Sequence, residues 1–414
     1  MLRLTKIRFV TAAFLLAFSF APALAGDVVL ENLTINEDKG VLRIARVEAL
    51  NTNLSSDEIR RLLDTSADGK EALAMLMRFS ADKFAISGAS FSGDEGTMIF
   101  APILATGIQK GRLERLICAG VDVDLKNIEG AGAVSVKFKA LEMEKADFAP
   151  LMSALTRGDA EIAGFRAERL VWGGFEASVP DADLSANAAG GNRIRVSLGK
   201  LISTNQYAGD TLVRSVGEIG NLVIELPPAS EGGRTLAGLG YSKLDLSMSG
   251  EARYDAATRA LVLENYMLKG IQAGQLRLSG KFGNVDPALL GMAVPNEKLA
   301  ALFLANVSEL EIRFVNEGLV DNGFAFAAVQ QGKSAAALRA ETSALAVQFL
   351  PMLLGGDPSS LPLAQSVQTF LKDSKNFTLT LKSRGAPLPL GRLSAIGDPA
   401  TFLALVEVTL KSNQ

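Results

Sequence analysis

Residues 241–283 read YSKLDLSMSGEARYDAATRALVLENYMLKGIQAGQLRLSGKFG, and this stretch predicts three strands joined by two turns. Apolar and polar residues alternate from 244 to 249, which is the period-two pattern of a strand with one solvated face. The alternation stops at 254–259, where Asp255 is placed to hydrogen-bond the backbone two residues later. Glycines mark the second turn. We therefore expect a meander whose apolar face carries Leu244, Leu246, Met248, Leu261, Leu263, Leu276 and Leu278.

The same one-faced alternation recurs along the preceding part of the chain. At 121–125, for example, valines and a leucine alternate with aspartates. Such segments predict antiparallel strands with one packed and one solvated face. The pattern at 97–115 fits either a strand ended by Pro102 or a short buried helix, and the Ser-Glu-Gly-Gly at 230–233 predicts a flexible connection. The region 26–285 is thus expected to form an extended antiparallel amphipathic sheet.

Helical patterns are expected early in the mature chain and again towards its end. Ser55 is followed by acidic residues, and this predicts a helix start because a capping serine accepts from free backbone N–H groups. After Pro287 the chain becomes rich in alanine and leucine, and Ser334 is expected to cap a long helix. Residues 286–414 are therefore predicted to form a helix-rich α+β domain. The expected fold class is α+β, dominated by β-structure.

The first 25 residues have the pattern of a cleavable secretory signal peptide. Basic residues precede an apolar run at 9–20, and the Ala-Leu-Ala at 23–25 has the small residues of a cleavage site. The apolar run is shorter than the ~20 residues of a spanning helix, so no stable transmembrane span is expected in the mature chain. We predict export to the periplasm and a division into 1–25, 26–285 and 286–414.

The mature chain is expected to be mildly acidic. The full chain has a net charge of -3, and removal of the three basic residues in 1–25, which contains no acidic residue, would lower it to -6. An acidic chain without a long run of Lys or Arg is a poor partner for nucleic acid. The same argument disfavours an anionic membrane surface.

The residue types present exclude most familiar catalytic sites. The chain has no histidine and a single cysteine, Cys118, which removes histidine-dependent triads and metal sites and prevents an intrachain disulfide. Pairs of acids two residues apart, such as Glu142 and Glu144, share one face of a strand, but that spacing is also typical of a solvated sheet face. We therefore expect no enzyme activity, no catalytic or metal-binding residues and no cofactor.

The strand pattern resembles that of the AsmA-like and TamB-like proteins of the Gram-negative envelope. The similarity lies in the phrases LDLSMSG at 244–250, ALVLEN at 260–265 and GQLRLSG at 274–280, and as a style of repeat it covers roughly 26–283. The resemblance implies long amphipathic β-sheets and a role in moving or shielding lipid between membranes. It brings no catalytic motif with it.

These observations favour a non-enzymatic periplasmic envelope protein that binds lipid or another apolar ligand on the apolar face of its sheet. Apolar area of that extent is rarely left without a partner. The alternative is a protein-interaction or scaffold module, in which helices cover the core completely and another envelope protein is the partner. The sequence leaves open whether the face is covered, which ligand or partner it binds, and the oligomeric state.

Overall fold

The alternating pattern folds into long strands, and the computed structural model is β-dominated, with 52% strand and 27% helix. The structure describes residues 26–37, 40–64, 69–126, 132–157, 164–181, 192–290 and 300–414. The predicted signal peptide at 1–25 lies outside the described residues. The chain divides into two compact units, residues 1–204 and 205–414.

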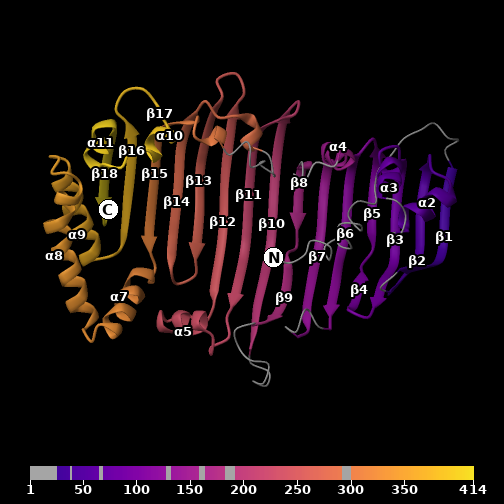
Figure 1. The fold of residues 1–414 in the computed structure, drawn as a ribbon, viewed down its shortest axis with the longest axis horizontal. Coiled ribbons are helices and arrows are strands. Elements are labelled where there is room, and N and C mark those ends of the chain that lie inside the picture. The colour runs from indigo at the N-terminus through magenta and orange to yellow at the C-terminus, as the bar shows by residue number, and fades with distance from the viewer. Residues whose placement is uncertain are drawn as a thin grey trace. The chain divides into compact units, whose positions relative to one another are not determined.

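The first unit is an antiparallel meander with helices in its connections (Figure 1). Its strands are β1 (Gly26–Glu37), β2 (Gly40–Thr52), β3 (Ser80–Gly93), β4 (Gly96–Phe100), β5 (Ile103–Gln109), β6 (Arg112–Leu125), β7 (Val134–Asp147), β8 (Arg166–Trp172), β9 (Phe175–Pro180) and β10 (Arg193–Ala208), the last of which runs past residue 204. Its helices are α2 (Ser56–Leu63), α3 (Gly69–Leu76) and α4 (Ala149–Arg157).

Strands that are consecutive in the chain pair with each other in this sheet, as β1 does with β2, β2 with β3 and β6 with β7. The stretch 97–115, which the sequence left open, is strand. Within it β4 and β5 lie end to end, and both pair with β3 and with β6. The break falls at Ala101 and Pro102, because proline has no N–H to donate to the ladder. In the same way β8 and β9 share one position between β7 and β10.

The helices of the first unit cover the apolar face of its sheet. The core joins side chains of α2, α3 and α4 to those of β1–β8, and Figure 1 shows α2 and α3 lying against β2 to β5. Val47, Ile59, Phe79, Phe84 and Met152 are completely or almost completely buried. The part of the apolar face that these core residues form is therefore covered by the unit's own helices.

The helix start predicted at Ser55 is confirmed. The Ser55 hydroxyl accepts a hydrogen bond from the Glu58 backbone N–H at 3.3 Å, and the Glu58 carboxylate accepts from the Ser55 backbone N–H at 2.8 Å. This reciprocal capping box satisfies two backbone donors that the first turn leaves free. It fixes the point at which α2 begins.

The second unit is also an antiparallel meander, and its helices lie towards the C-terminus (Figure 1). Its strands are β11 (Thr211–Glu225), β12 (Leu244–Asp255), β13 (Ala260–Gly270), β14 (Gly274–Gly283), β15 (Asn306–Asn316), β16 (Asn376–Ser383), β17 (Leu388–Pro389) and β18 (Val406–Ser412). Its helices are α5 (Glu231–Gly238), the 3₁₀ helix η2 (Pro287–Leu290), α7 (Leu319–Gln330), α8 (Ala335–Leu353), α9 (Ser360–Lys372), α10 (Leu390–Ser394) and α11 (Pro399–Leu405).

The three strands and two turns expected at 241–283 are confirmed as β12, β13 and β14. Asp255 accepts from the Ala257 backbone N–H at 2.9 Å in the first turn, as its position predicts. The sheet continues past residue 285, because β14, which ends at Gly283, pairs along its whole length with β15, which begins at Asn306. The predicted domain boundary at 285/286 stays a prediction, and the sheet of the second unit extends across it.

Bulges interrupt the regular alternation of several strands in this sheet, and two of them lie at asparagines. The register shifts beside Asn221 in β11 and beside Asn265 in β13, and both asparagines have positive φ, 53° and 50°. Asparagine tolerates this left-handed conformation better than most residues. A bulge adds one residue, so Leu263 and Tyr266 point to the same side of the sheet although they are three positions apart.

The flexible connection predicted at 230–233 is wrong, because these residues begin helix α5. The Ser230 hydroxyl caps the helix by accepting from the Gly233 backbone N–H at 3.0 Å. A Cβ at Gly233 would collide with the Pro227 carbonyl, and one at Gly238 would collide with the ring of Phe326 on α7. The glycines allow close packing here, and tertiary contacts override their weak helix propensity.

Helix α8 follows the sequence expectation of a long helix that begins at Ser334. Ser334 caps α8 by accepting from the Ala337 backbone N–H at 3.2 Å. Within the described ranges, no helix has both the length and the apolar character needed to cross a membrane.

Candidate functional site

All seven residues predicted for the apolar face lie on one side of the second unit's sheet. Leu244, Leu246 and Met248 are on β12, Leu261 and Leu263 on β13, and Leu276 and Leu278 on β14. Residues opposite each other in an antiparallel pair point to the same side, and so do residues two apart on a strand. The register together with the bulge at Asn265 therefore puts all seven side chains on the same face.

One row of apolar side chains crosses five strands of this face. Met248 lies opposite Leu268, Leu268 opposite Leu276, Leu276 opposite Phe314, and Phe314 opposite Phe377. Neighbouring strands are about 4.8 Å apart, so the row spans roughly 19 Å. We call Met248, Leu268, Leu276, Phe314 and Phe377 the apolar row.

A second row runs beside it and contains residues that the sequence reasoning missed. Tyr266 lies opposite Leu278, and the row continues through Ile312, Leu379 and Leu410. Strict alternation from Leu263 places Tyr266 and Leu268 on the polar side. The signal that could have corrected this is Asn265, an asparagine within an apolar strand pattern, which is where a bulge is expected.

The apolar face of the second unit is open over β12–β14. Met248 is 46% exposed, Leu276 39% and Leu268 38%. The other five predicted residues are half-buried, namely Leu244, Leu246, Leu261, Leu263 and Leu278. The first unit contrasts with this, because its helices bury a large part of the equivalent face. Large apolar side chains that remain this exposed beside one another mark a binding surface more often than a random patch.

Helix α9 covers the other end of the apolar row. The Phe370 ring of α9 lies 5.1 Å from the Phe377 ring and 6.2 Å from the Phe314 ring, measured between centroids, in edge-to-face arrangements. Because Phe314 lies opposite Leu276, α9 sits on the same side as the exposed part of the row. The row is therefore covered over β15 and β16 and open over β12–β14.

The opposite face of the sheet carries ion pairs between neighbouring strands. Glu251 on β12 accepts hydrogen bonds from Arg214 and Arg253, both at 2.7 Å. These bonds and the two positive charges lower the pKa of Glu251 to about 2. Glu309 on β15 pairs with Lys281 at 3.0 Å and with Lys382 at 3.2 Å, and its pKa is lowered by the same causes. These ion pairs suit the face to contact with water.

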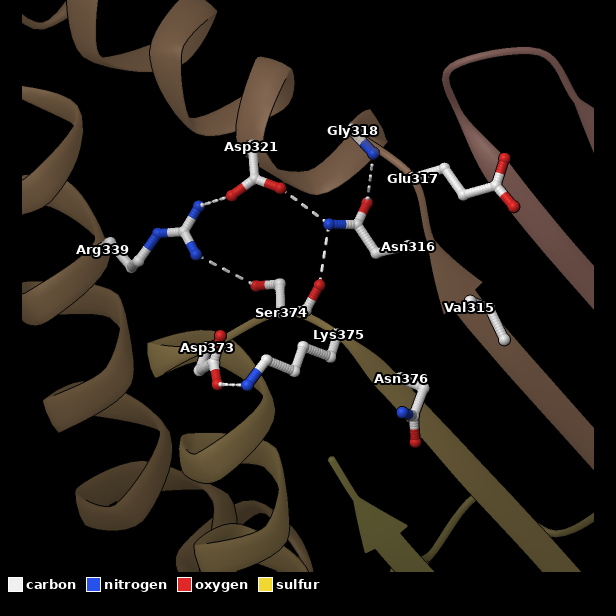
Figure 2. A pocket seen from close by; sticks show the side chains of 10 residues that line it. All are labelled: Val315, Asn316, Glu317, Gly318, Asp321, Arg339, Asp373, Ser374, Lys375 and Asn376. Atoms are coloured by element: carbon white, nitrogen blue, oxygen red, sulfur yellow. Dashed lines mark hydrogen bonds and ion pairs between the residues drawn. The ribbon is translucent and has the colours of Figure 1, made fainter. Parts of the chain in front are cut away.

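A polar cleft of about 500 Å³ lies where β15, α7, α8 and the α9–β16 turn meet. Figure 2 shows Arg339 between Asp321 and Ser374, with Asn316 facing them. The Arg339 guanidinium donates to Asp321 at 2.5 Å and to the Ser374 hydroxyl at 3.2 Å. It also lies 4.8 Å above the ring of Phe324. The Asn316 amide donates to Asp321 and to the Ser374 carbonyl, each at 2.7 Å.

The groups of this cleft use their hydrogen-bonding capacity on one another. Burial raises the pKa of Asp321, but the hydrogen bonds from Arg339 and Asn316 and the charge of Arg339 outweigh burial, so the pKa lies below its usual value. Lys375 pairs with Asp373 at 2.7 Å. We interpret the cleft as a structural junction that ties α7 and α8 to the end of the sheet.

The acid pairs considered from the sequence lie on solvated faces where both residues are described, and Asp183, the partner of Asp181, lies outside the described residues. Glu142 pairs with Arg115 at 2.6 Å and Glu144 with Arg169 at 3.0 Å. Asp122 is exposed and lies opposite Lys137. Among the described residues, no three or more acids and cysteines gather as they would to hold a metal ion.

The fold thus defines a class of protein: antiparallel meanders with one apolar and one ion-paired face. A family model described as "Uncharacterized protein" matches residues 267–413, which run from within β13 to the residue after β18. No curated protein matches the chain. The matched segment contains most of the apolar row and the helices α7, α8 and α9.

Proposed function

We propose that this protein is a non-enzymatic envelope protein, exported to the periplasm, that binds acyl chains of lipid on the apolar face of its second sheet. The observation that carries the proposal is the apolar row, exposed over β12–β14 and running on to Phe314 and Phe377 under α9. The signal-peptide pattern of 1–25 supports the compartment.

The dimensions of the apolar row suit an extended hydrocarbon chain. Its span of roughly 19 Å across five strands is comparable with the length of an extended acyl chain. Each methylene group that leaves water contributes about 0.8 kcal/mol, and part of that gain offsets the cost of immobilising the ligand. Affinity should therefore rise with chain length until the row is filled.

The two faces of the sheet also restrict where such a ligand can lie. The ion pairs around Glu251 and Glu309 keep the opposite face polar, so an acyl chain gains nothing there. A lipid would place its chain along the row and leave its headgroup towards water, because burying an unpaired polar group is costly.

The first test is to purify the full chain, extract it with organic solvent and analyse the extract by mass spectrometry. We expect acyl chains to co-purify in a stoichiometric amount. A delipidated sample should then bind a fluorescent fatty acid saturably, and fatty acids of increasing length should displace the probe with increasing affinity. Clean extracts together with no saturable binding would reject the proposal.

A protein-interaction module is the second candidate, and the exposed apolar side chains of α8, among them Met352 and Leu353, favour it. It predicts lipid-free extracts and one protein that is recovered repeatedly with the full chain. That module requires a completely covered core, and the exposure of Met248, Leu268 and Leu276 counts against such a cover.

A further inference from the structure

Helix α8 turns large apolar side chains to solvent, and Gln348 is the polar residue among them. Its exposed positions recur with helical spacing and include Leu345, Phe349, Met352 and Leu353. A helix of a soluble protein normally carries charged residues on this face, and a helix that is apolar all round is normally buried. Glu341 is the last charged residue of this face, and it pairs with Lys333 near the N-terminal end of α8.

Exposure of the apolar side chains increases towards the end of α8 that joins α9. Met352 is 72% exposed and Leu353 68%, more than the two apolar residues that precede them on the face. The connection continues through Gly355 and Gly356 to α9, where Leu361 is also exposed. We call α8, α9 and their connection the α8–α9 hairpin, and residues 349–361 its tip.

The hairpin is almost free of charge. Between Thr342 and Leu371 the sole charged residue is Asp357. The Asp357 carboxylate accepts from the Ser359 hydroxyl at 2.5 Å and from the Ser359 backbone N–H at 2.8 Å. The tip therefore has no basic side chain of its own that would attract an anionic lipid headgroup.

We infer that the tip of the α8–α9 hairpin inserts into the surface of an electrically neutral lipid bilayer. Insertion requires a few apolar side chains at one end of the hairpin, and the tip presents them with a single charged residue, Asp357, whose carboxylate is hydrogen-bonded within the tip. A second copy of the chain fits less well. The tip exposes four large apolar side chains, Phe349, Met352, Leu353 and Leu361, whereas a stable dimer interface takes about 20–30 residues and about 800 Å² on each partner.

The inference goes beyond the proposed function and does not rest on it. Docking needs the tip, and acyl-chain binding needs the apolar row. The two surfaces are connected, since Phe370 of α9 packs on Phe314 and Phe377 at the covered end of the row.

The test is flotation of the full chain with phosphatidylcholine vesicles, and with vesicles that also contain phosphatidylglycerol, at low and high salt. We expect the wild-type chain to float with phosphatidylcholine vesicles at low and at high salt, and no better when phosphatidylglycerol is present. The double variant M352D/L353D should partition about tenfold or more weakly, because both charges would enter the interface. Every variant keeps residues 1–25, so any contribution of that segment is the same throughout.

The matched control is Val329→Asp, a change at an apolar residue of α7 that is 80% exposed. Val329 precedes α8 in the chain, and the 19 residues of α8 separate the tip from that end by about 28 Å. We expect V329D to float like the wild-type chain.

A second readout uses Leu353→Cys labelled with an environment-sensitive dye, since Cys118 is buried and should not compete for the label. Its emission should shift to the blue with phosphatidylcholine vesicles, and that of a label at V329C should not.

Several results would overturn the inference. These are failure of the wild-type chain to float, flotation that needs phosphatidylglycerol and low salt, and equal flotation of M352D/L353D. Loss of a solution dimer in M352D/L353D would identify the tip as a self-interface and would also overturn it. Fatty-acid binding should be unchanged in M352D/L353D, so failure of docking and failure of the proposed function can be told apart.

Discussion

Leu276 on β14 lies directly opposite Leu268 on β13, and both side chains remain more than one-third exposed. In the first unit, by contrast, Phe79 packs edge to face on Phe84 at 5.4 Å, and both rings are buried. The two units have the same kind of amphipathic meander. They differ in how far helices cover the apolar face. Helices α2–α4 pack on the core residues of the first sheet, whereas the described helices of the second unit leave the apolar face of β12–β14 exposed.

Replacement of Leu276 by aspartate should weaken acyl-chain binding strongly. The carboxylate would stand in the middle of the apolar row, where a bound chain cannot solvate it. We expect the affinity for a fluorescent fatty acid to fall at least about tenfold, which corresponds to about 1.4 kcal/mol. The measurement is a fluorescence titration of the delipidated chain.

The matched control for that variant is Arg277→Asp, one residue further along the same strand. Arg277 points to the opposite face and lies directly across from Arg313. An aspartate there replaces a like-charge pair with an opposite-charge pair, so the fold should be kept or slightly stabilised. R277D should bind the fatty acid like the wild-type chain. Equal loss of binding in both variants would argue against a ligand on the apolar face.

Truncation of core and face residues should have very different effects on stability. Phe79 is fully buried, so Phe79→Ala should lower the free energy of unfolding of the first unit by about 3–5 kcal/mol. Leu276→Ala should cost about 1 kcal/mol or less, because much of that side chain is already in water. Urea denaturation followed by circular dichroism would measure both. A large cost for Leu276→Ala would mean that the face is covered in solution.

The Glu251 ion pairs should make the stability of the second unit depend on pH below about 4.5. The folded-state pKa of Glu251 is lowered from 4.5 to about 2, mainly by hydrogen bonds from Arg214 and Arg253. A lowered folded-state pKa gives stabilisation that is fully present above 4.5 and is lost as the pH falls towards 2. Wild type should therefore be more stable than Glu251→Gln at neutral pH, and the difference should vanish near pH 2.

Urea midpoints of the two chains measured from neutral pH to pH 2 would test this. Ser249→Ala on the same strand is the control, since it removes no titratable group and should leave the pH profile unchanged. A difference between wild type and E251Q that stays constant over the whole range would contradict the assignment.

The bulge at Asn265 should reject β-branched residues. Asn265 has a φ of 50°, and this left-handed conformation costs an ordinary side chain roughly 1–2 kcal/mol. Asn265→Val should destabilise the second unit by about that amount, whereas Asn265→Gly should be tolerated because glycine has no Cβ. Equal urea midpoints for the two variants would show that the bulge does not exist in solution.

Sequence patterns predicted most of the strands and several helix starts, since these depend on local chemistry. The alternation at 244–249 and the caps at Ser55 and Ser334 led to elements that the structure contains. Local chemistry misled at 230–233, where the glycines form the start of α5. They do so because Gly233 and Gly238 leave room for Pro227 and Phe326, residues that the local sequence does not show to be near.

Only part of the candidate site could be predicted, because the rest depends on contacts that the local sequence does not show. Seven residues of the apolar face could be found from alternation alone, but Tyr266 and Leu268 could not, because the bulge at Asn265 shifts the period. Phe314 and Phe377 lie on strands that are distant in sequence from β12. Only the register of successive strand pairs brings them into one row with Met248.

By itself, the sequence determined that this chain forms one-faced strands, that it lacks the residues for histidine-based catalysis, and where several of its helices begin. These properties follow from side-chain periodicity, composition and capping, which act over a few residues. The tertiary structure alone decided which apolar face is covered and which is open. That outcome depends on which part of each sheet the helices pack against, and contacts between residues distant in sequence fix their positions.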